Sequence, residues 1–413
     1  MPAKVKKITV IFILALFLSG CSNELSPKDS YVFGQDEQYN LFTTYLDYMC
    51  ESDTAIYFMS GYNREYIYIH DKKSKTTVPL CNKPDCKHTL ETDAKKAFAC
   101  NAFLGTDTSC LQYYNEFIYY VDRDHTPDNQ NIKNLVSTRD DPIITLKRIL
   151  IDGTHRETVY KFTETVMDLV IHRGYAYFWT QGSKTDKDDD NRYIYKLYRL
   201  NLAHPNETPE LLDEGYELDG RIAGILCYGN SVYYCVAYYK DETFSEMVRY
   251  INVYDIISKE KKKLIENASA PFTVFNDKLV YRVIDQKDYP TYACDLDGTN
   301  VKQISAKGGV YTTNGTYLVM DTYPPTENGR VVTVMDKDFN VVKTISLDES
   351  YSMPAGCSGD FYYISKKAQE TRYGSKIAIS AVPLKSEPGD ENPETFFEFI
   401  PEIEFPGVNK SIN

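Results

Sequence analysis

The stretch Gly359-Asp360-Phe361-Tyr362-Tyr363-Ile364-Ser365 sets a two-residue turn directly before a run of aromatic and aliphatic residues. Glycine and aspartate supply the backbone angles of a tight β-hairpin, and tyrosine, phenylalanine and isoleucine favour strands. Near-copies of the aromatic run recur along most of the chain, at residues 55–60, 117–122, 175–180, 232–235, 279–281 and 317–321. Turn signals precede most copies: Arg173-Gly174, Gly229-Asn230, Asn276-Asp277 and Asn314-Gly315. Each copy therefore predicts the second strand of a hairpin.

A second mark follows each copy, where an apolar run ends in an Asp or Asn turn and another short strand begins. These turns are His70-Asp71, Asp152-Gly153, Leu200-Asn201, Tyr254-Asp255, Asp297-Gly298 and Met335-Asp336. Between residues 274 and 304 a whole unit can be counted: one strand ends at Phe275, and the others lie around Val280, around Ala293 and over residues 301–304. The repeating unit is predicted to be a four-stranded meander.

The recurrence of such units, roughly every 40 to 60 residues, predicts an all-β fold, a β-propeller of four-stranded blades. About seven blades are expected, with six or eight possible. A lone meander cannot bury both faces, whereas sheets stacked radially cover their faces and shelter their edges. The ring would close either by residues 41–49 joining the last blade or by residues 396–400 completing it. A pair of β-sandwiches is the alternative that the same strand spacing allows.

The composition agrees with sheet. The 413 residues include 36 Tyr and 19 Phe but only 8 Met and 1 Trp, and repeat-built β domains can be this long. The formal net charge of -13 repels polyphosphate, so no nucleic-acid partner is expected. We expect the chain to be a monomer.

The N-terminus predicts export and lipid anchoring. Three lysines, Lys4, Lys6 and Lys7, precede an apolar run over residues 8–18 that is too short to cross a bilayer comfortably. The run ends in Leu18-Ser19-Gly20-Cys21, which resembles a bacterial lipoprotein cleavage site in which the cysteine becomes the lipidated first residue of the mature protein. An ordinary secretory signal with an incidental cysteine is the alternative.

These marks divide the chain into four segments. Residues 1–21 are the predicted signal peptide with lipidated Cys21, and residues 22–38, rich in Ser, Asn, Asp and Glu, are a flexible tether. Residues 39–405 form the propeller, with a cysteine-rich insertion at 81–110, and residues 406–413 are a C-terminal tail. The protein would lie at the bacterial cell membrane, lipid-anchored and facing the extracytoplasmic side.

Two of the aromatic runs carry a family resemblance. Ile118-Tyr119-Tyr120-Val121-Asp122 and Tyr177-Phe178-Trp179-Thr180, with their downstream Asp turns, resemble the repeats of YWTD-type and Tol-system-type β-propellers, including uncharacterised propeller lipoproteins of Gram-positive bacteria. The resemblance covers residues 41–399, although only the third copy carries the Trp. It implies the fold and leaves the activity open, because such propellers bind proteins, glycans or small molecules and some are enzymes.

The segment Cys81-Asn82-Lys83-Pro84-Asp85-Cys86-Lys87-His88, followed by Cys100 and Cys110, departs most from the repeat. Cys81, Cys86, His88 and Cys100 could hold a structural zinc ion as a Cys₃His site, although the four residues between the first two cysteines exceed the usual knuckle spacing. A disulfide among Cys81, Cys86, Cys100 and Cys110 is the alternative, since thiols can oxidise outside the cytoplasm. Nine cysteines remain besides Cys21, and an odd number cannot all pair.

The other candidate sites favour structural interpretations. Cys227 and Cys235 flank a hairpin, but side chains alternate along a strand, so the two should point to opposite faces as buried thiols. Residues 186–191 lack the glycine and the closing acid of a calcium loop. His172 is expected to be a turn residue, and the recurring tyrosines are expected to pack blade against blade.

Two functions remain open. The sequence favours a membrane-anchored binding or protein-interaction scaffold with an unknown protein or glycan ligand, because no catalytic motif is recognisable in it. The alternative is an exported propeller enzyme that acts on glycans or peptides, with acids converging from several blade loops.

Overall fold

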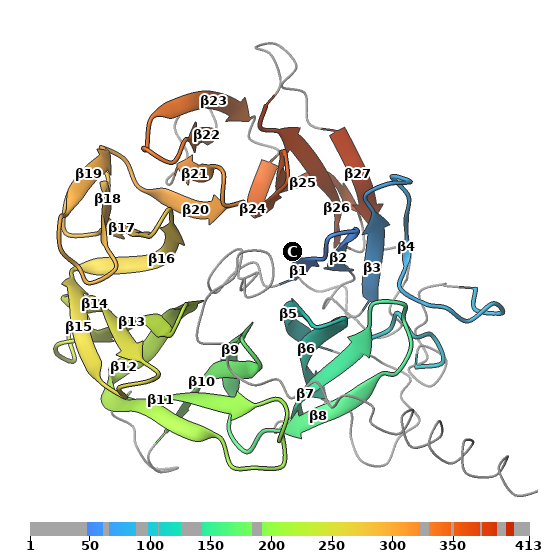
Figure 1. Ribbon diagram of the computed structural model, residues 1–413, viewed down its shortest axis with the longest axis horizontal. Helices are drawn as coiled ribbons and strands as arrows, with labels where there is room; N and C mark the ends of the chain where they lie inside the picture. The colour runs from blue at the N-terminus through green and yellow to red at the C-terminus, as the bar shows by residue number, and fades with distance from the viewer. Residues whose placement is uncertain are drawn as a thin grey trace, which may run out of the picture.

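The computed structural model describes residues 48–60, 66–87, 98–105, 107–124, 143–183, 192–322, 330–347, 351–371, 374–385 and 394–399. These residues form antiparallel sheets arranged around one axis (Figure 1). The sheets follow one another around the ring in chain order, so the predicted β-propeller is confirmed and the alternative of two sandwiches is wrong.

The first three blades follow one another in the part of the chain that is coloured blue to green (Figure 1). Blade 1 consists of β1 (Met49–Glu51), β2 (Ala55–Ser60), β3 (Tyr66–Asp71) and β4 (Thr77–Pro79). Blade 2 consists of β5 (Thr108–Tyr114), β6 (Phe117–Asp124), β7 (Ile143–Leu150) and β8 (Glu157–Lys161). Blade 3 consists of β9 (Val166–His172), β10 (Tyr175–Ser183), β11 (Arg192–Asn201) and the first half of β12 (Glu210–Tyr228).

The remaining four blades complete the ring. Blade 4 adds β13 (Ser231–Tyr239), β14 (Met247–Asp255) and β15 (Lys261–Glu266) to the second half of β12. Blade 5 consists of β16 (Ala268–Phe275), β17 (Lys278–Val283), β18 (Thr291–Asp295) and β19 (Lys302–Ser305). Blade 6 consists of β20 (Gly309–Thr313), β21 (Leu318–Thr322), β22 (Arg330–Met335) and β23 (Val341–Leu347). Blade 7 consists of β24 (Tyr351–Ser358), β25 (Phe361–Thr371), β26 (Gly374–Pro383) and β27 (Glu394–Phe399).

The long strand β12 belongs to two blades at once. Its residues up to Leu218 pair with β11, and its residues from Leu218 onward pair with β13, with a register shift between Leu218 and Arg221. The seven-stranded sheet β9–β15 therefore holds two blades that share one strand. Together with the five four-stranded sheets, these two blades bring the described residues to the predicted seven blades.

Contacts between the inner strands close the ring. Each inner strand contacts the next in the order β1, β5, β9, β12, β16, β20 and β24, and β24 contacts β1. The last blade is completed by β27 from the C-terminal segment, which pairs with β26, whereas β1 pairs within blade 1. Of the two predicted closures, the one that uses residues around 396–400 is confirmed.

Two adjacent aromatic residues on a second strand pack in two different interblade cores. Tyr119 packs in the core between blades 2 and 3, whereas its neighbour Tyr120 packs in the core between blades 1 and 2. In the opening motif, Tyr362 lies between blades 6 and 7 and Tyr363 lies between blades 7 and 1. Because side chains alternate along a strand, two adjacent aromatics cover both faces of a blade. The predicted blade-on-blade packing of tyrosines is confirmed.

The turns have the backbone angles and the side-chain hydrogen bonds that the sequence predicts. Backbone φ angles are positive at Arg173, Gly174, Asn276 and Gly359, as tight hairpins require. Between the third and fourth strands, aspartate side chains accept hydrogen bonds from the backbone amides that follow them. Turns of this kind begin at Asp71, Asp152, Asp255, Asp297 and Asp336.

Replacing Tyr362 by Phe should destabilise the contact between blades 6 and 7. The Tyr362 hydroxyl donates to Asp321 Oδ2 at 2.6 Å, and Arg330 also donates to this oxygen at 2.6 Å. Asp321 is buried, so the lost donor should lower the free energy of unfolding by about 1–3 kcal/mol. The control is Tyr233→Phe, because the Tyr233 hydroxyl makes a long bond of 3.4 Å to Leu296 O. Equal urea midpoints for the two variants would contradict the prediction.

Replacing Asp336 by Ala should destabilise the outer turn of blade 6 in a pH-dependent way. Its Oδ1 accepts from the amides of Asp338 and Asn340 at 2.9 Å, and the Asn340 amide is the main cause that lowers the pKa of Asp336 from its ordinary 3.8. A lowered carboxyl pKa stabilises the fold above 3.8 and loses this effect as pH falls through the lower folded value. The gap in melting temperature between wild type and Asp336→Ala should therefore narrow on acidification, whereas Asp338→Ala should show no such gap.

Candidate metal centre

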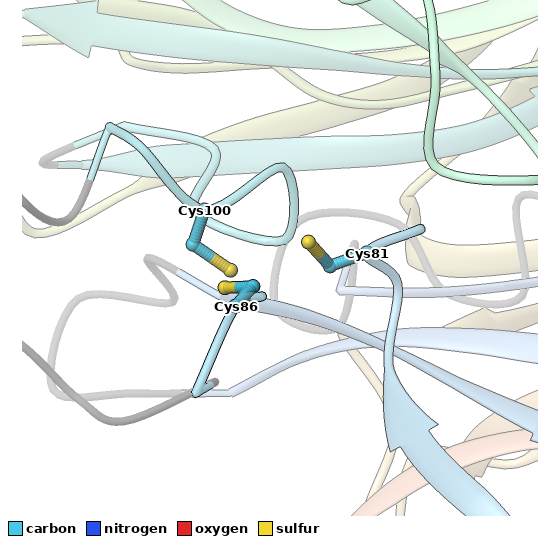
Figure 2. A group of neighbouring side chains, drawn as sticks. All are labelled: Cys81, Cys86 and Cys100. Atoms are coloured by element: carbon cyan, nitrogen blue, oxygen red, sulfur yellow. The ribbon is translucent and has the colours of Figure 1, made fainter. Parts of the chain in front are cut away.

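Three cysteines from the predicted insertion lie together at the outer edge of blade 1. Cys81 follows β4, Cys86 ends a turn in which its amide donates to Lys83 O at 3.2 Å, and Cys100 precedes β5. Their sulfur atoms all lie within 4.8 Å of one another and point toward a common centre (Figure 2). Two cysteines that follow β4 and one that lies 14 positions further along the chain thus contribute to one thiol group.

Backbone amides are directed at these sulfurs. Although burial alone would raise it, the pKa of Cys81 is lowered because the amides of Lys83 and Asn101, and the neighbouring thiols, donate to its sulfur. Cys100 is buried, and burial followed by the Cys86 thiol raises its pKa to about 12, although the Ala102 amide opposes this. Amide donors two residues after a cysteine stabilise a thiolate, which is the form that binds a metal.

A second layer of contacts ties the thiol group to blade 2. Asn101 Nδ2 donates to Gly153 O at 2.6 Å and to Asn82 Oδ1 at 3.1 Å, and Lys83 Nζ donates to Ala99 O at 2.6 Å. Gly153 has a φ of 79°, and a Cβ there would lie 2.9 Å from Leu80 O. This close approach of the β7–β8 turn to blade 1 therefore requires glycine.

Three converging thiols suit a metal better than a disulfide. In a tetrahedral zinc site with Zn–S bonds of about 2.3 Å the sulfurs lie roughly 3.8 Å apart, which is compatible with three sulfurs that all lie within 4.8 Å of one another. A disulfide would use two of the three and leave a buried or half-buried thiol beside it. The donor set fits zinc, with three thiols in place and one further position to fill.

The structure brings together three of the predicted ligands. His88 lies outside the described residues, so its role as fourth ligand stays a prediction. Cys110 does not belong to the group: it lies on β5, fully buried in the core between blades 2 and 3, whereas Cys81, Cys86 and Cys100 contact the core between blades 1 and 2. The disulfide alternative is thereby narrowed to the remaining three cysteines.

The other sequence candidates are structural where they are described. Tyr228 faces Ser231 and Cys227 faces Val232, and Cys227 and Cys235 are buried in different interblade cores, as predicted. His172 is buried at its turn and its Nε2 lies 2.9 Å from Gly229 O. Residues 186–191 lie outside the described part of the chain.

Three deeply buried aspartates form ion pairs within one blade or between adjacent blades. The pairs are Asp122 with Lys147 at 2.5 Å, Asp213 with Lys261 at 2.5 Å and Asp321 with Arg330 at 2.6 Å. Tyrosine hydroxyls from adjacent strands or blades donate to two of these carboxylates. These acids therefore stabilise the blades.

Sequence reasoning missed that Arg221 on β12 and Arg249 on β14 both lie opposite Ala237 on β13. The two arginines share no local motif. The indication in the sequence is the Asp219-Gly220 pair, which precedes Arg221 where an otherwise continuous strand changes partners.

No protein-family model matches the chain, and no curated protein matches it. Among solved structures, a prolyl endopeptidase matches with a TM-score of 0.56 and 10% identity over 87% of this chain and 51% of that chain. A puromycin hydrolase matches with a TM-score of 0.54 and 8% identity over 91% of this chain and 58% of that chain. TolB from Acinetobacter baumannii matches with a TM-score of 0.39 and 13% identity over 84% of this chain and 79% of that chain. The chain thus spans about half the length of the two hydrolases, and at these identities the first two matches show the fold alone.

The purified full chain should contain one zinc ion bound through Cys81, Cys86 and Cys100. We expect metal analysis to find about one equivalent of zinc, and Cys86→Ala to lower this content severalfold, because two thiolates hold the ion much less tightly than three. Cys227→Ala, in a distant core, is the matched control and should retain the metal.

Thiol counting separates the alternatives. In denaturant with chelator but no reductant, all nine cysteines other than Cys21 should react if the site binds metal. Two unreactive thiols without zinc would indicate a disulfide, and nine reactive thiols without zinc would contradict both interpretations. His88→Ala tests the fourth ligand in the same measurement.

Proposed function

We propose that this chain is a lipid-anchored, extracytoplasmic β-propeller that serves as a binding or interaction scaffold. The observation that carries the proposal is where the repeated residues lie. The largest fully buried side chains are mostly tyrosines, and they lie in interblade cores. The residues that repeat from blade to blade are therefore committed to packing. Recognition is left to side chains that differ between blades, which is how a scaffold presents a specific surface.

The anchor rests on the sequence. Residues 1–47, which include Cys21, lie outside the described residues, and the lipoprotein-type ending Leu18-Ser19-Gly20-Cys21 supports the proposal. Within the described ranges, no helix is long and apolar enough to span a bilayer.

The thiol group supports a scaffold because its place is structural. It lies where β4 ends and the chain crosses to blade 2, and the neighbouring Asn101 reaches the β7–β8 turn. A zinc ion held there would tie the two blades together, and a Cys₃His set would leave no open position for a substrate. The metal would stabilise the ring while the binding surface lies elsewhere.

The enzyme alternative depends on acids from several blade loops. Three of the described buried aspartates are paired with cations of the same or the adjacent blade, which does not favour that role. The matched prolyl endopeptidase and puromycin hydrolase are hydrolases by name, but their likeness to this chain is in fold. We therefore place the scaffold first.

Cys21→Ala should release the protein from the membrane. In a Gram-positive host, the wild-type chain should sediment with membranes and be accessible to added protease on intact cells, whereas the variant should appear in the medium, because one residue carries the lipid. Surface cross-linking should give a discrete adduct for wild type that the released variant does not form.

Two results would count against the proposal. Membrane retention of Cys21→Ala would contradict the anchor. Hydrolysis of peptide or glycan substrates by the purified wild-type chain, lost when an acid of a blade loop is replaced, would favour the enzyme.

A further inference from the structure

The fourth strand of blade 1 consists of two separate pieces of chain. The first piece is β4, which has three residues. Ile67 on β3 marks the point where the second piece begins: its carbonyl accepts from the Leu80 amide at 3.0 Å, and its own amide donates to Ala102 O at 2.8 Å. Residues 98–105, which we call the strap, therefore continue the outer edge of blade 1 beyond β4.

The strap packs into the core between blades 1 and 2. Ala102, Phe103 and Leu104 are completely buried there. Phe103 forms an isolated antiparallel bridge with Tyr66, and the two rings meet edge-on with 5.2 Å between their centroids. From blade 2, the Tyr120 hydroxyl donates to Leu104 O at 3.4 Å. The strap is thus part of the interface between the two blades.

One arginine of blade 2, Arg156, holds the strap on both sides of Cys100. Its guanidinium donates to the carbonyl oxygens of Phe103 and, at 3.3 Å, of Phe98. It also lies 5.7 Å from the centroid of the Phe98 ring, which packs edge-on against Phe103. Two carbonyl acceptors and an aromatic ring keep the guanidinium in this position. The loop that carries Cys100 is therefore positioned by a side chain that cannot itself bind a metal, because a guanidinium has no acceptor atom.

A metal ion at the thiol group would bind the strap to the segment that follows β4. Cys100 lies on the strap, whereas Cys81 and Cys86 come after β4, and the three sulfurs lie within 4.8 Å of one another (Figure 2). All three can hold one ion only while the strap is docked, so the ion favours the docked conformation by the difference in its affinity for the two conformations. Such coupling is reciprocal, so a change that weakens docking must also weaken metal binding.

The closure of the ring does not depend on the strap. In blade 1 the inner strand β1 and the outer strand β4 form opposite edges of the sheet. The contacts of β1 with β5 and with β24 close the ring at the inner edge, whereas the strap lies at the outer edge. Release of the strap would therefore open the outer edge of blade 1 and leave the ring closed.

We propose that residues 98–105 form a metal-dependent conformational switch. With zinc bound, the strap completes the fourth strand of blade 1. Without zinc, the strap is released and exposes the Ile67 amide and the outer end of the core between blades 1 and 2. This inference rests on the candidate metal centre and goes beyond the scaffold function, because a chain of this kind would respond to the zinc that is present outside the cell.

The first test is hydrogen exchange of the full chain in detergent, compared as purified, after chelation and after reloading with zinc. The Ile67 amide should exchange about tenfold faster or more after chelation and regain its protection with zinc, because its acceptor Ala102 O leaves with the strap. The Met59 amide, which donates to Tyr48 O at 2.8 Å in the same blade, is the internal control and should not change. Cys86→Ala, which removes a ligand outside the strap, should behave like the chelated wild type.

The second test is the zinc affinity of Arg156→Gln, measured by competition with a chromophoric chelator. The apparent Kd should rise by about tenfold, although Arg156 is not a ligand, because a smaller fraction of the chain has the strap docked. Arg148→Gln is the matched control and should bind zinc as wild type does. Arg148 also belongs to blade 2, where it pairs with Glu157 at 2.6 Å and lies 4.2 Å from the centroid of the Phe117 ring.

The inference is overturned if chelation removes zinc without changing exchange at Ile67, or if Arg156→Gln keeps the zinc affinity of wild type. Equal acceleration at Met59 and Ile67 would also overturn it, because the opening would not be confined to the strap. A chain that neither contains nor takes up zinc contradicts the metal centre and the switch together. The surface adduct of the anchored chain is measured independently of zinc, so failure of the switch and failure of the scaffold are distinguishable.

Discussion

The constraint on which this structure depends is that each blade must bury both faces of its second strand. Alternation sends neighbouring side chains to opposite faces, so a pair of adjacent large residues covers both at once. Tyr233 and Tyr234 illustrate this: the first packs between blades 4 and 5, and the second between blades 3 and 4. No blade can satisfy this requirement alone. Between the first and the last blade it is satisfied because Met49, Ile56 and Phe58 of blade 1 pack against Tyr363 and Ile379 of blade 7.

Burial on both faces also explains why the large buried side chains are so often tyrosines. The blades contain buried carboxylates, and an unpaired buried charge is costly. The hydroxyl of Tyr234 donates to Asp213 at 2.7 Å, and that of Tyr362 donates to Asp321 at 2.6 Å. A phenylalanine would supply the same apolar area without the donor, so tyrosine is the residue that fills the core and satisfies the acid together.

Sequence reasoning succeeded where the determinants are local and repeated. The hairpin before Phe361, the turn at Asp336 and the four strands of blade 5 each depend on residues close in the chain. Because the same pattern recurs, each unit supports the prediction of the others. The convergence of Cys81, Cys86 and Cys100 was predictable because the three lie within one insertion. The exclusion of Cys110 was not, because it depends on the strand β5 that begins at Thr108.

Residues that come together from different strands show why sequence reasoning ended where it did. Arg221 and Arg249 both lie opposite Ala237 because β12 changes partners at a bulge, and this cannot be read from the residues around either arginine. The thiol group and this arginine pair share one property, however. Each lies where the repeat is interrupted, by an insertion between β4 and β5 or by a shift of register within β12. In a ring whose repeated residues are committed to packing, such interruptions are the positions where a side chain is free to contact something other than the next blade.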